Sequence, residues 1–127
     1  MLTPASKILV VDDFSTMRRI VKMTLSQLGY EHITEAESAI EAQALLKESQ
    51  FDLIVCDWNM PGMTGLDLLK WVRSQERLRT VPFLMVTAEA KKSNIIEAVQ
   101  AGVTNYLVKP FNKQALEERI QAIATKE

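Results

Sequence analysis

Four short stretches of this sequence are apolar without interruption, and they constrain the fold more than any other feature. The runs span residues 8–11, 53–56, 83–86 and 106–108. None of them alternates apolar with polar side chains, as a strand with one face in water would. Continuous runs of this length are typical of strands in a parallel sheet that helices cover on both sides. A weaker, more polar run around residues 33–34 predicts a fifth strand at the edge.

The segments between these runs carry the spacing of amphipathic helices. The clearest apolar stripe comprises Met17, Ile20, Val21, Thr24, Leu25 and Leu28. Its members recur at intervals of three and four residues, which places them on one helical face, and Gly29 predicts where that helix ends. Similar spacings predict helices over residues 39–46, 65–72, 95–101 and 115–127.

Strands therefore alternate with helices along the whole chain. This order predicts an α/β fold, namely a five-stranded, parallel, doubly wound sheet with helices on both faces. The chain has 127 residues, of which 47% are hydrophobic and 24% charged, and this composition is that of one globular domain. We expect residues 1–127 to form a single domain with no separate output domain.

Charge and cysteine content exclude several classes of protein. The 15 basic and 16 acidic side chains give no general attraction to nucleic acid or to anionic membranes. No apolar stretch reaches the roughly 20 residues that a membrane span needs, and the start of the chain does not resemble a signal peptide. Cys56 is the single cysteine, which rules out a disulfide framework and a cysteine-rich zinc site. We expect a cytoplasmic monomer without a nucleic-acid or membrane partner.

Polar side chains follow the predicted strands at the edge where open doubly wound sheets bind their ligands. Asp12 and Asp13 end the first strand, Asp57 ends the third, Thr87 ends the fourth and Lys109 ends the fifth. Each has a plain structural alternative, such as a helix cap for Asp13 or Thr87 and a surface position for Lys109. Four strands that each deliver a polar group to one edge favour a functional site over four coincidences.

Three carboxylates at this edge call for a cation. Two like charges about 4 Å apart repel each other by roughly 4 kcal/mol at an effective dielectric constant near 20. A set of hard oxygen ligands favours Mg²⁺. An aspartate that faces Mg²⁺, Lys109 and the Thr87 hydroxyl is suited to accept a phosphoryl group, because its carboxylate can act as the nucleophile while its neighbours stabilise the phosphoryl oxygens.

Four motifs resemble those of CheY-type chemotaxis response regulators, which are single-domain members of the receiver family. The motifs are residues 10–20 (VVDDFSTMRRI), 57–63 (DWNMPGM), 86–92 (VTAEAKK) and 108–111 (VKPF). The resemblance extends over nearly the whole chain. It implies the flavodoxin-like fold with strand order 2-1-3-4-5.

The resemblance implies a role for each acidic residue of the site. Asp57 matches the phosphoacceptor, which takes a phosphoryl group from a phosphohistidine on a sensor histidine kinase. Asp12 and Asp13 match the acidic pair that binds Mg²⁺ together with Asp57 and the backbone carbonyl of Asn59. A dedicated phosphatase is a further partner that the resemblance allows.

The resemblance also implies a switch. Lys109 matches the lysine that contacts a phosphoryl oxygen, and the Lys109–Pro110 bond matches a cis peptide that orients this lysine. Thr87 matches the hydroxyl that moves toward the phosphoryl group. Tyr106 matches the aromatic ring that turns inward when that hydroxyl moves.

In the chemotaxis branch, the fourth helix, fifth strand and fifth helix offer a docking face to the flagellar motor switch protein. The candidate residues of that face are Lys92, Ile95, Val99, Val103, Tyr106 and Arg119. Val99 and Val103 are bulkier than the residues common there. Asn105 stands where Gly is usual, and Arg119 where Lys is frequent. Two functions therefore stay open: a phosphorylated switch that binds the motor, or the same phosphochemistry used as a phosphate sink or to engage another partner.

Three other functions on related folds are disfavoured. The Asp-x-Asp signature of one family of aspartyl-phosphate hydrolases is missing, because Trp58 and Asn59 follow Asp57. A flavin carrier would need a phosphate-binding Gly/Ser/Thr loop after the first strand. A DNA-binding regulator would need a helix-turn-helix after the last helix.

Four side chains outside this site also carry expectations. Cys56 should pack as a small apolar residue on the side of its strand opposite the Asp57 carboxylate. His32 begins the predicted edge strand, and we interpret it as an exposed loop residue that is neither a ligand nor a base. Trp58 beside the site and Trp71 on the third helix should both be partly buried.

Overall fold

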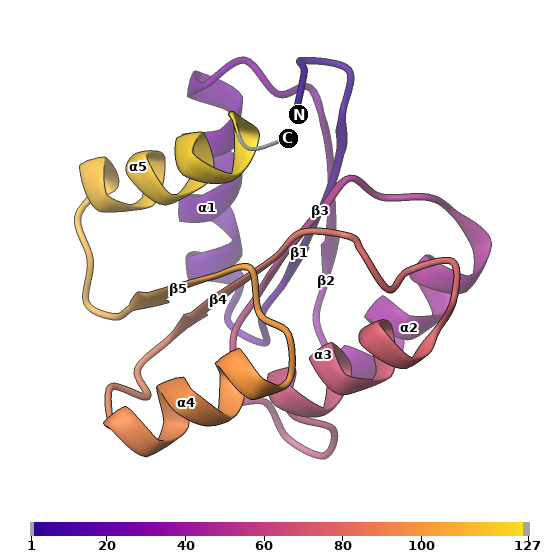
Figure 1. The fold of residues 1–127 in the computed structure, drawn as a ribbon. Coiled ribbons are helices and arrows are strands. Elements are labelled where there is room, and N and C mark those ends of the chain that lie inside the picture. The colour runs from indigo at the N-terminus through magenta and orange to yellow at the C-terminus, as the bar shows by residue number, and fades with distance from the viewer. Residues whose placement is uncertain (1, 126–127) are drawn as a thin grey trace.

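The computed structural model describes residues 2–125, in which five strands alternate with five helices (Figure 1). The strands are β1 (Lys7–Val11), β2 (His32–Ala36), β3 (Leu53–Cys56), β4 (Phe83–Thr87) and β5 (Asn105–Val108). The helices are α1 (Ser15–Gln27), α2 (Ala39–Glu48), α3 (Gly65–Ser74), α4 (Lys92–Gln100) and α5 (Lys113–Ala124). The predicted alternation of strands and helices is confirmed.

All strand pairs in the sheet are parallel, and the strand order is β2-β1-β3-β4-β5. Helices α1 and α5 cover one face, while α2, α3 and α4 lie over the other (Figure 1). Both the predicted fold class and the strand order implied by the resemblance are confirmed. The register pairs Val11 with Cys56, so the residues that follow β1 and β3 emerge side by side.

The apolar core is divided by the sheet into two clusters. Leu9, Ile54 and Phe83 point to the cluster that α2 and α3 complete. Ile8, Val55 and further neighbours on the same strands point to the other cluster, which α1 and α5 complete. Because both faces of the inner strands are buried, their sequences are continuously apolar instead of alternating. Strand β2 lies at the edge, and it is correspondingly more polar and more exposed.

The boundaries of several elements differ from the sequence-based expectation. Strand β4 extends to Thr87, and β5 begins at Asn105. His32 begins the edge strand β2 and is exposed, as expected, but it pairs with Lys7 of β1 and is therefore a strand residue and not a loop residue. Helix α5 is described as far as Ala124, and the end of the predicted helix at residues 126–127 lies outside the described residues.

The buried face of α1 is rotated from the predicted stripe. Ile20 is 43% exposed, whereas Arg18 is buried. At about 100° per residue, Ile20 lies roughly 120° from the centre of the arc formed by Val21 and Leu25, which places it outside the most buried part of the face. Arg18 lies on the other side of this centre, where its guanidinium donates to the Asp12 carbonyl oxygen at 2.6 Å. Gly29 has φ +102° and ends this helix as predicted.

Candidate functional site

Three carboxylates meet at the carboxyl ends of β1 and β3. One ligand oxygen from each of Asp12, Asp13 and Asp57 lies within 4.8 Å of the others. Asp12 and Asp57 are buried, and Asp13 is exposed. The Val11–Cys56 register explains this convergence, since Asp12 and Asp57 are the next residues of their strands. A compact set of oxygen donors of this kind is compatible with Mg²⁺.

Lys109 brings a positive charge into the same cluster from the end of β5. Its Nζ lies 3.3 Å from Oδ2 of Asp12 and 3.5 Å from Oδ2 of Asp57. Its side chain is only 17% exposed, so the alternative of a surface lysine is wrong. The Lys109–Pro110 peptide is cis, as the resemblance implies.

Burial dominates the electrostatics of Asp12. It raises the pKa of this carboxyl above its usual value, although a hydrogen bond from the Phe14 backbone N–H and the charge of Lys109 both act to lower it. The Asp12 carboxylate thus closes a turn in the loop before α1 by accepting from the residue two positions on. Asp13 does not cap α1, because Phe14 is the residue at the N-cap position and the helix has no side-chain cap there.

Thr87 is fully buried at the end of β4. Its Oγ1 accepts a hydrogen bond from the Glu89 backbone N–H at 3.2 Å. Helix α4 begins only at Lys92, with Lys91 at its N-cap, so Thr87 is not the cap of that helix. The hydroxyl instead lies in the loop that joins the acidic edge of the sheet to α4.

Glu89 links three parts of the molecule, and sequence reasoning did not single it out as a site residue. Its Oε1 accepts from Nδ2 of Asn59 at 3.0 Å, and its Oε2 accepts from Nδ2 of Asn94 at 2.9 Å. Asn59 also donates its backbone N–H to Oδ1 of Asp57 at 3.4 Å. A signal was available, since Glu89 is the charged residue two positions after Thr87 in the loop that follows β4.

The Tyr106 ring is already half-buried. Its hydroxyl donates to the Glu89 carbonyl oxygen at 2.6 Å, and the ring packs against the core cluster beneath α2 and α3. Burial, with smaller contributions from the charges of Glu89 and Asp57, raises the pKa of Tyr106 to about 12. Thr87 and Tyr106 therefore bind the backbone N–H and the backbone carbonyl of the same residue, Glu89.

Comparison with known proteins decides the family. Residues 8–121 match the response regulator receiver domain. The chain belongs to the response regulator receiver family. Its relatives include the chemotaxis protein CheY of Pseudomonas aeruginosa, which is 58% identical over 117 residues that cover 92% of this chain and 94% of that protein. CheY-3 of Vibrio cholerae is 56% identical, with coverage of 92% and 90%.

Solved structures agree with this assignment. The structure of CheY4 from Vibrio cholerae matches this receiver domain with a TM-score of 0.87 at 38% identity, covering 94% of this chain and 98% of that one. The family is one of signalling switches, and the relatives named above are chemotaxis proteins. Within residues 2–125 of this receiver domain, no helix is long and apolar enough to cross a bilayer.

The candidate docking face of this receiver domain is only partly exposed. Lys92 and Val99 are exposed, whereas Ile95, Val103 and Arg119 are half-buried, as is Tyr106. Val99 is the most exposed large apolar residue of this face, with 62% of its surface accessible. Ile96, which the sequence analysis did not include, is also exposed. Arg119 donates from Nε to the Tyr106 carbonyl oxygen at 3.1 Å, which ties α5 to β5.

Three side chains outside the acidic cluster lie as predicted. Cys56 is fully buried in the cluster beneath α2 and α3, and burial raises the pKa of its thiol well above the usual value. Trp58 and Trp71 are half-buried and pack against the same cluster.

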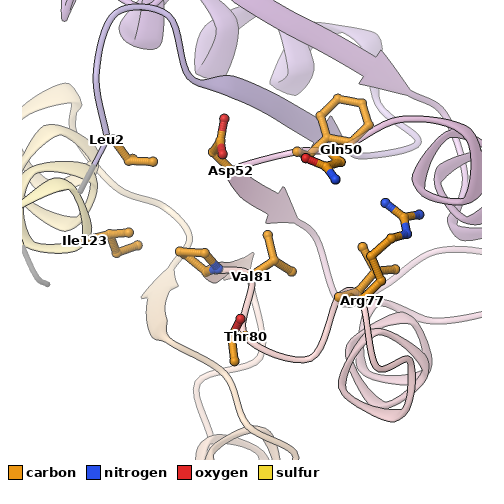
Figure 2. A pocket seen from close by; sticks show the side chains of 10 residues that line it. Leu2, Gln50, Asp52, Arg77, Thr80, Val81 and Ile123 are labelled. Atoms are coloured by element: carbon orange, nitrogen blue, oxygen red, sulfur yellow. The ribbon is translucent and has the colours of Figure 1, made fainter.

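A hollow of about 360 Å³ lies at the opposite edge of the receiver domain, where the amino ends of β3 and β4 meet (Figure 2). In Figure 2, Arg77 lies across the hollow from Leu2 and Ile123. The Arg77 guanidinium donates to the carbonyl oxygens of Leu46 and Ser49 near the end of α2. Asp52 accepts a hydrogen bond from the Lys7 backbone N–H at 2.8 Å. The charged groups of this hollow therefore serve the fold, and the acidic cluster remains the candidate site.

Proposed function

We propose that this receiver domain is a phosphorylation-activated switch of two-component chemotaxis signalling, with Asp57 as its phosphoacceptor. The observation that carries the proposal is the buried Asp57 carboxylate, 3.5 Å from the Lys109 ammonium and clustered with Asp12 and Asp13. The chemotaxis relatives support the signalling context. The proposed partner upstream is a sensor histidine kinase, and the proposed location is the cytoplasm.

The chemical step transfers a phosphoryl group from a phosphohistidine to the carboxylate. An Asp57 oxygen forms a bond to phosphorus while the bond from phosphorus to the imidazole nitrogen breaks. The imidazole keeps the electron pair of that bond and takes up a proton from water. Lys109, already within 3.5 Å of Asp57, stabilises negative charge on the phosphoryl oxygens.

The donor set fits a magnesium ion, since it consists of three carboxylates whose oxygens lie within 4.8 Å of one another. Asp12, Asp13 and Asp57, with the backbone carbonyl of Asn59, are the groups that would bind it. Bound Mg²⁺ would offset the repulsion among these carboxylates and the negative charge of the phosphoryl group. Asp13 is the exposed member of the cluster.

Phosphorylation would act on the docking face through Glu89. A phosphoryl oxygen gives the Thr87 hydroxyl a charged acceptor, and such a bond contributes about 1.5–3 kcal/mol. Because the Glu89 backbone bonds to both Thr87 and Tyr106, a shift of Thr87 toward the phosphoryl group displaces the segment that holds the Tyr106 hydroxyl. The two states of this pair would be the switch.

The docking face on α4, β5 and α5 would engage the flagellar motor switch protein. The Tyr106 ring is already half-buried and hydrogen-bonded before phosphorylation, and Val99 adds apolar bulk to the surface. We therefore expect weak binding to the motor with little gain on activation.

The second candidate function is a phosphate sink or docking on another partner. The half-buried Tyr106 ring favours it, because weak motor binding leaves the phosphochemistry free for another use. With either function, a dedicated phosphatase would act on the phosphorylated protein. We propose that the domain works as a monomer.

Intact-mass measurement tests the phosphoacceptor. A small phosphodonor with Mg²⁺ should add one phosphoryl group to the wild type and none to Asp57→Asn, because an amide lacks the nucleophilic oxygen. The matched control is Asp52→Asn, which removes an aspartate at the opposite edge and should be labelled like the wild type. Equal labelling of Asp57→Asn and the wild type would refute the assignment.

Calorimetry with a motor switch peptide tests the docking function. Titrations with and without beryllofluoride, which mimics the phosphoryl group, measure the gain in affinity on activation. A small gain is expected. A strong gain would contradict the preset position of Tyr106 and favour ordinary motor binding, and absence of binding in both states would favour the phosphate sink or another partner.

A further inference from the structure

The peptide that follows Asp57 is in contact with the first residue of α3. A Cβ placed on Gly65 would lie 2.0 Å from the Asp57 carbonyl oxygen, 2.8 Å from its carbonyl carbon and 2.9 Å from Cα of Trp58. All three atoms belong to the backbone and cannot turn aside as a flexible side chain would. Gly65 has no positive φ, so glycine is required here by the close approach and not by backbone conformation.

The same carbonyl is also contacted by a thiol. Sγ of Cys56 donates to the Asp57 carbonyl oxygen at 3.1 Å. The thiol is fully buried, so this contact is shielded from solvent. Gly65 adds a second backbone contact, since its N–H donates to the Trp58 carbonyl oxygen at 2.8 Å.

Helix α3 is a rigid base for this contact. Its N-terminus carries a complete capping box, in which Thr64 and Asp67 each accept the other's backbone N–H. Leu68, Leu69 and Val72 anchor the helix in the core with no exposed surface. Because α3 is fixed by its cap and its core contacts, Gly65 cannot readily move away from the Asp57 peptide.

We propose that Gly65 and Cys56 are positioning residues for phosphoryl transfer, because together they set the orientation of the peptide between Asp57 and Trp58. This inference rests on the proposed role of Asp57. A rotation of that peptide swings the Asp57 carboxylate relative to its two partners, Nζ of Lys109 at 3.5 Å and the backbone N–H of Asn59 at 3.4 Å. Small displacements of a reacting group lower rates steeply.

Variants of Cys56 test the thiol contact. We expect Cys56→Ala to lower the phosphorylation rate constant at saturating small phosphodonor and Mg²⁺ by about two- to fivefold, with the half-saturating donor concentration unchanged. Cys56→Ser keeps a donor of similar size and should restore the rate constant. The matched control is Leu46→Ala on α2, which removes packing from the same core cluster without touching α3 and should lower thermal stability without changing the rate constant.

Gly65→Ala tests the backbone contact and should lower the same rate constant by about tenfold or more if the variant folds. If Gly65→Ala does not fold, the rate constants of Cys56→Ala and Cys56→Ser test the inference on their own. A wild-type rate constant for Cys56→Ala, or failure of Cys56→Ser to restore it, would overturn the inference while leaving Asp57 as the phosphoacceptor. A wild-type protein that takes up no phosphoryl group would instead refute the proposed function itself.

Discussion

Asn59 donates its side-chain amide to Oε1 of Glu89 at 3.0 Å, across 30 residues of sequence. This hydrogen bond joins the loop after β3, which carries Asp57, to the loop after β4. The other oxygen of Glu89 accepts from Asn94 in the first turn of α4 at 2.9 Å. One carboxylate therefore connects the acidic cluster to the helix that carries most of the exposed docking face.

Replacing Glu89 by Ala should loosen the start of α4. The variant removes the acceptor for Asn94, and a hydrogen bond of this kind contributes about 1 kcal/mol net. Amide hydrogens of residues 92–96 should exchange about fivefold faster, as measured by hydrogen exchange and mass spectrometry. Glu97→Ala, a change on the exposed side of the same helix, is the control. Equal exchange in the two variants would show that Glu89 does not hold α4.

Removing Asp13 should separate metal binding from stability. Asp13 is exposed, so Asp13→Ala relieves like-charge repulsion and should raise the free energy of unfolding of the metal-free protein by up to about 1 kcal/mol. Asp12→Ala should not give this gain, because Asp12 also accepts from Phe14 and Lys109.

Both changes should weaken Mg²⁺ binding by about tenfold or more, since even the loss of an outer-shell partner costs about that much. Titration of tryptophan fluorescence, to which Trp58 beside Asp57 contributes, measures the midpoints. Unchanged midpoints in both variants would contradict the proposed metal site.

Lys109→Met should destabilise the metal-free protein. It leaves the buried carboxylates of Asp12 and Asp57 without their cation, and removal of one partner from a buried ion pair costs about 3 kcal/mol. The loss should shrink in acid, where the Asp12 carboxyl, whose pKa is raised by burial, takes up a proton. Urea unfolding measures the change in the free energy of unfolding. The control is Lys113→Met, which removes the partner of Glu117 in a surface ion pair and should cost less than about 1 kcal/mol. A loss no larger than that of the control would refute the pairing.

Tyr106 should titrate far above the ordinary range of a tyrosine. Its pKa is raised from 10.0 to about 12, first by burial and then by the charge of Glu89. Between these two values the folded state keeps a proton that the unfolded state has lost. The contribution of Tyr106 to stability is therefore complete below pH 10 and is lost as the pH rises through about 12.

Ultraviolet absorbance of tyrosinate measures this titration. The difference between the wild type and Tyr106→Phe isolates Tyr106 from Tyr30, whose pKa burial also raises. A midpoint near 10 for Tyr106 would show that the ring is solvated and that its hydroxyl is not bonded to the Glu89 carbonyl.

The sequence by itself determined the class of fold and the place of the site. Runs such as residues 8–11 are continuously apolar because both faces of an inner strand meet helices, and that pattern can be read without coordinates. The convergence of Asp12, Asp57 and Lys109 also followed from the sequence, since the carboxyl ends of parallel strands reach one edge of the sheet. Both properties depend on local periodicity and chain direction alone.

Only the tertiary structure decided which distant groups touch. The contacts of Glu89 with Asn59 and Tyr106 depend on loop paths that leave no periodic signal in the sequence. The exposure of Ile20 depends on where β2 and α5 flank α1. Gly65 likewise reads as an ordinary helix start, and its role emerges only because packing brings α3 against the carbonyl of Asp57. Periodicity reports which face of an element is buried, whereas contact between elements is set by register, rotation and loop geometry.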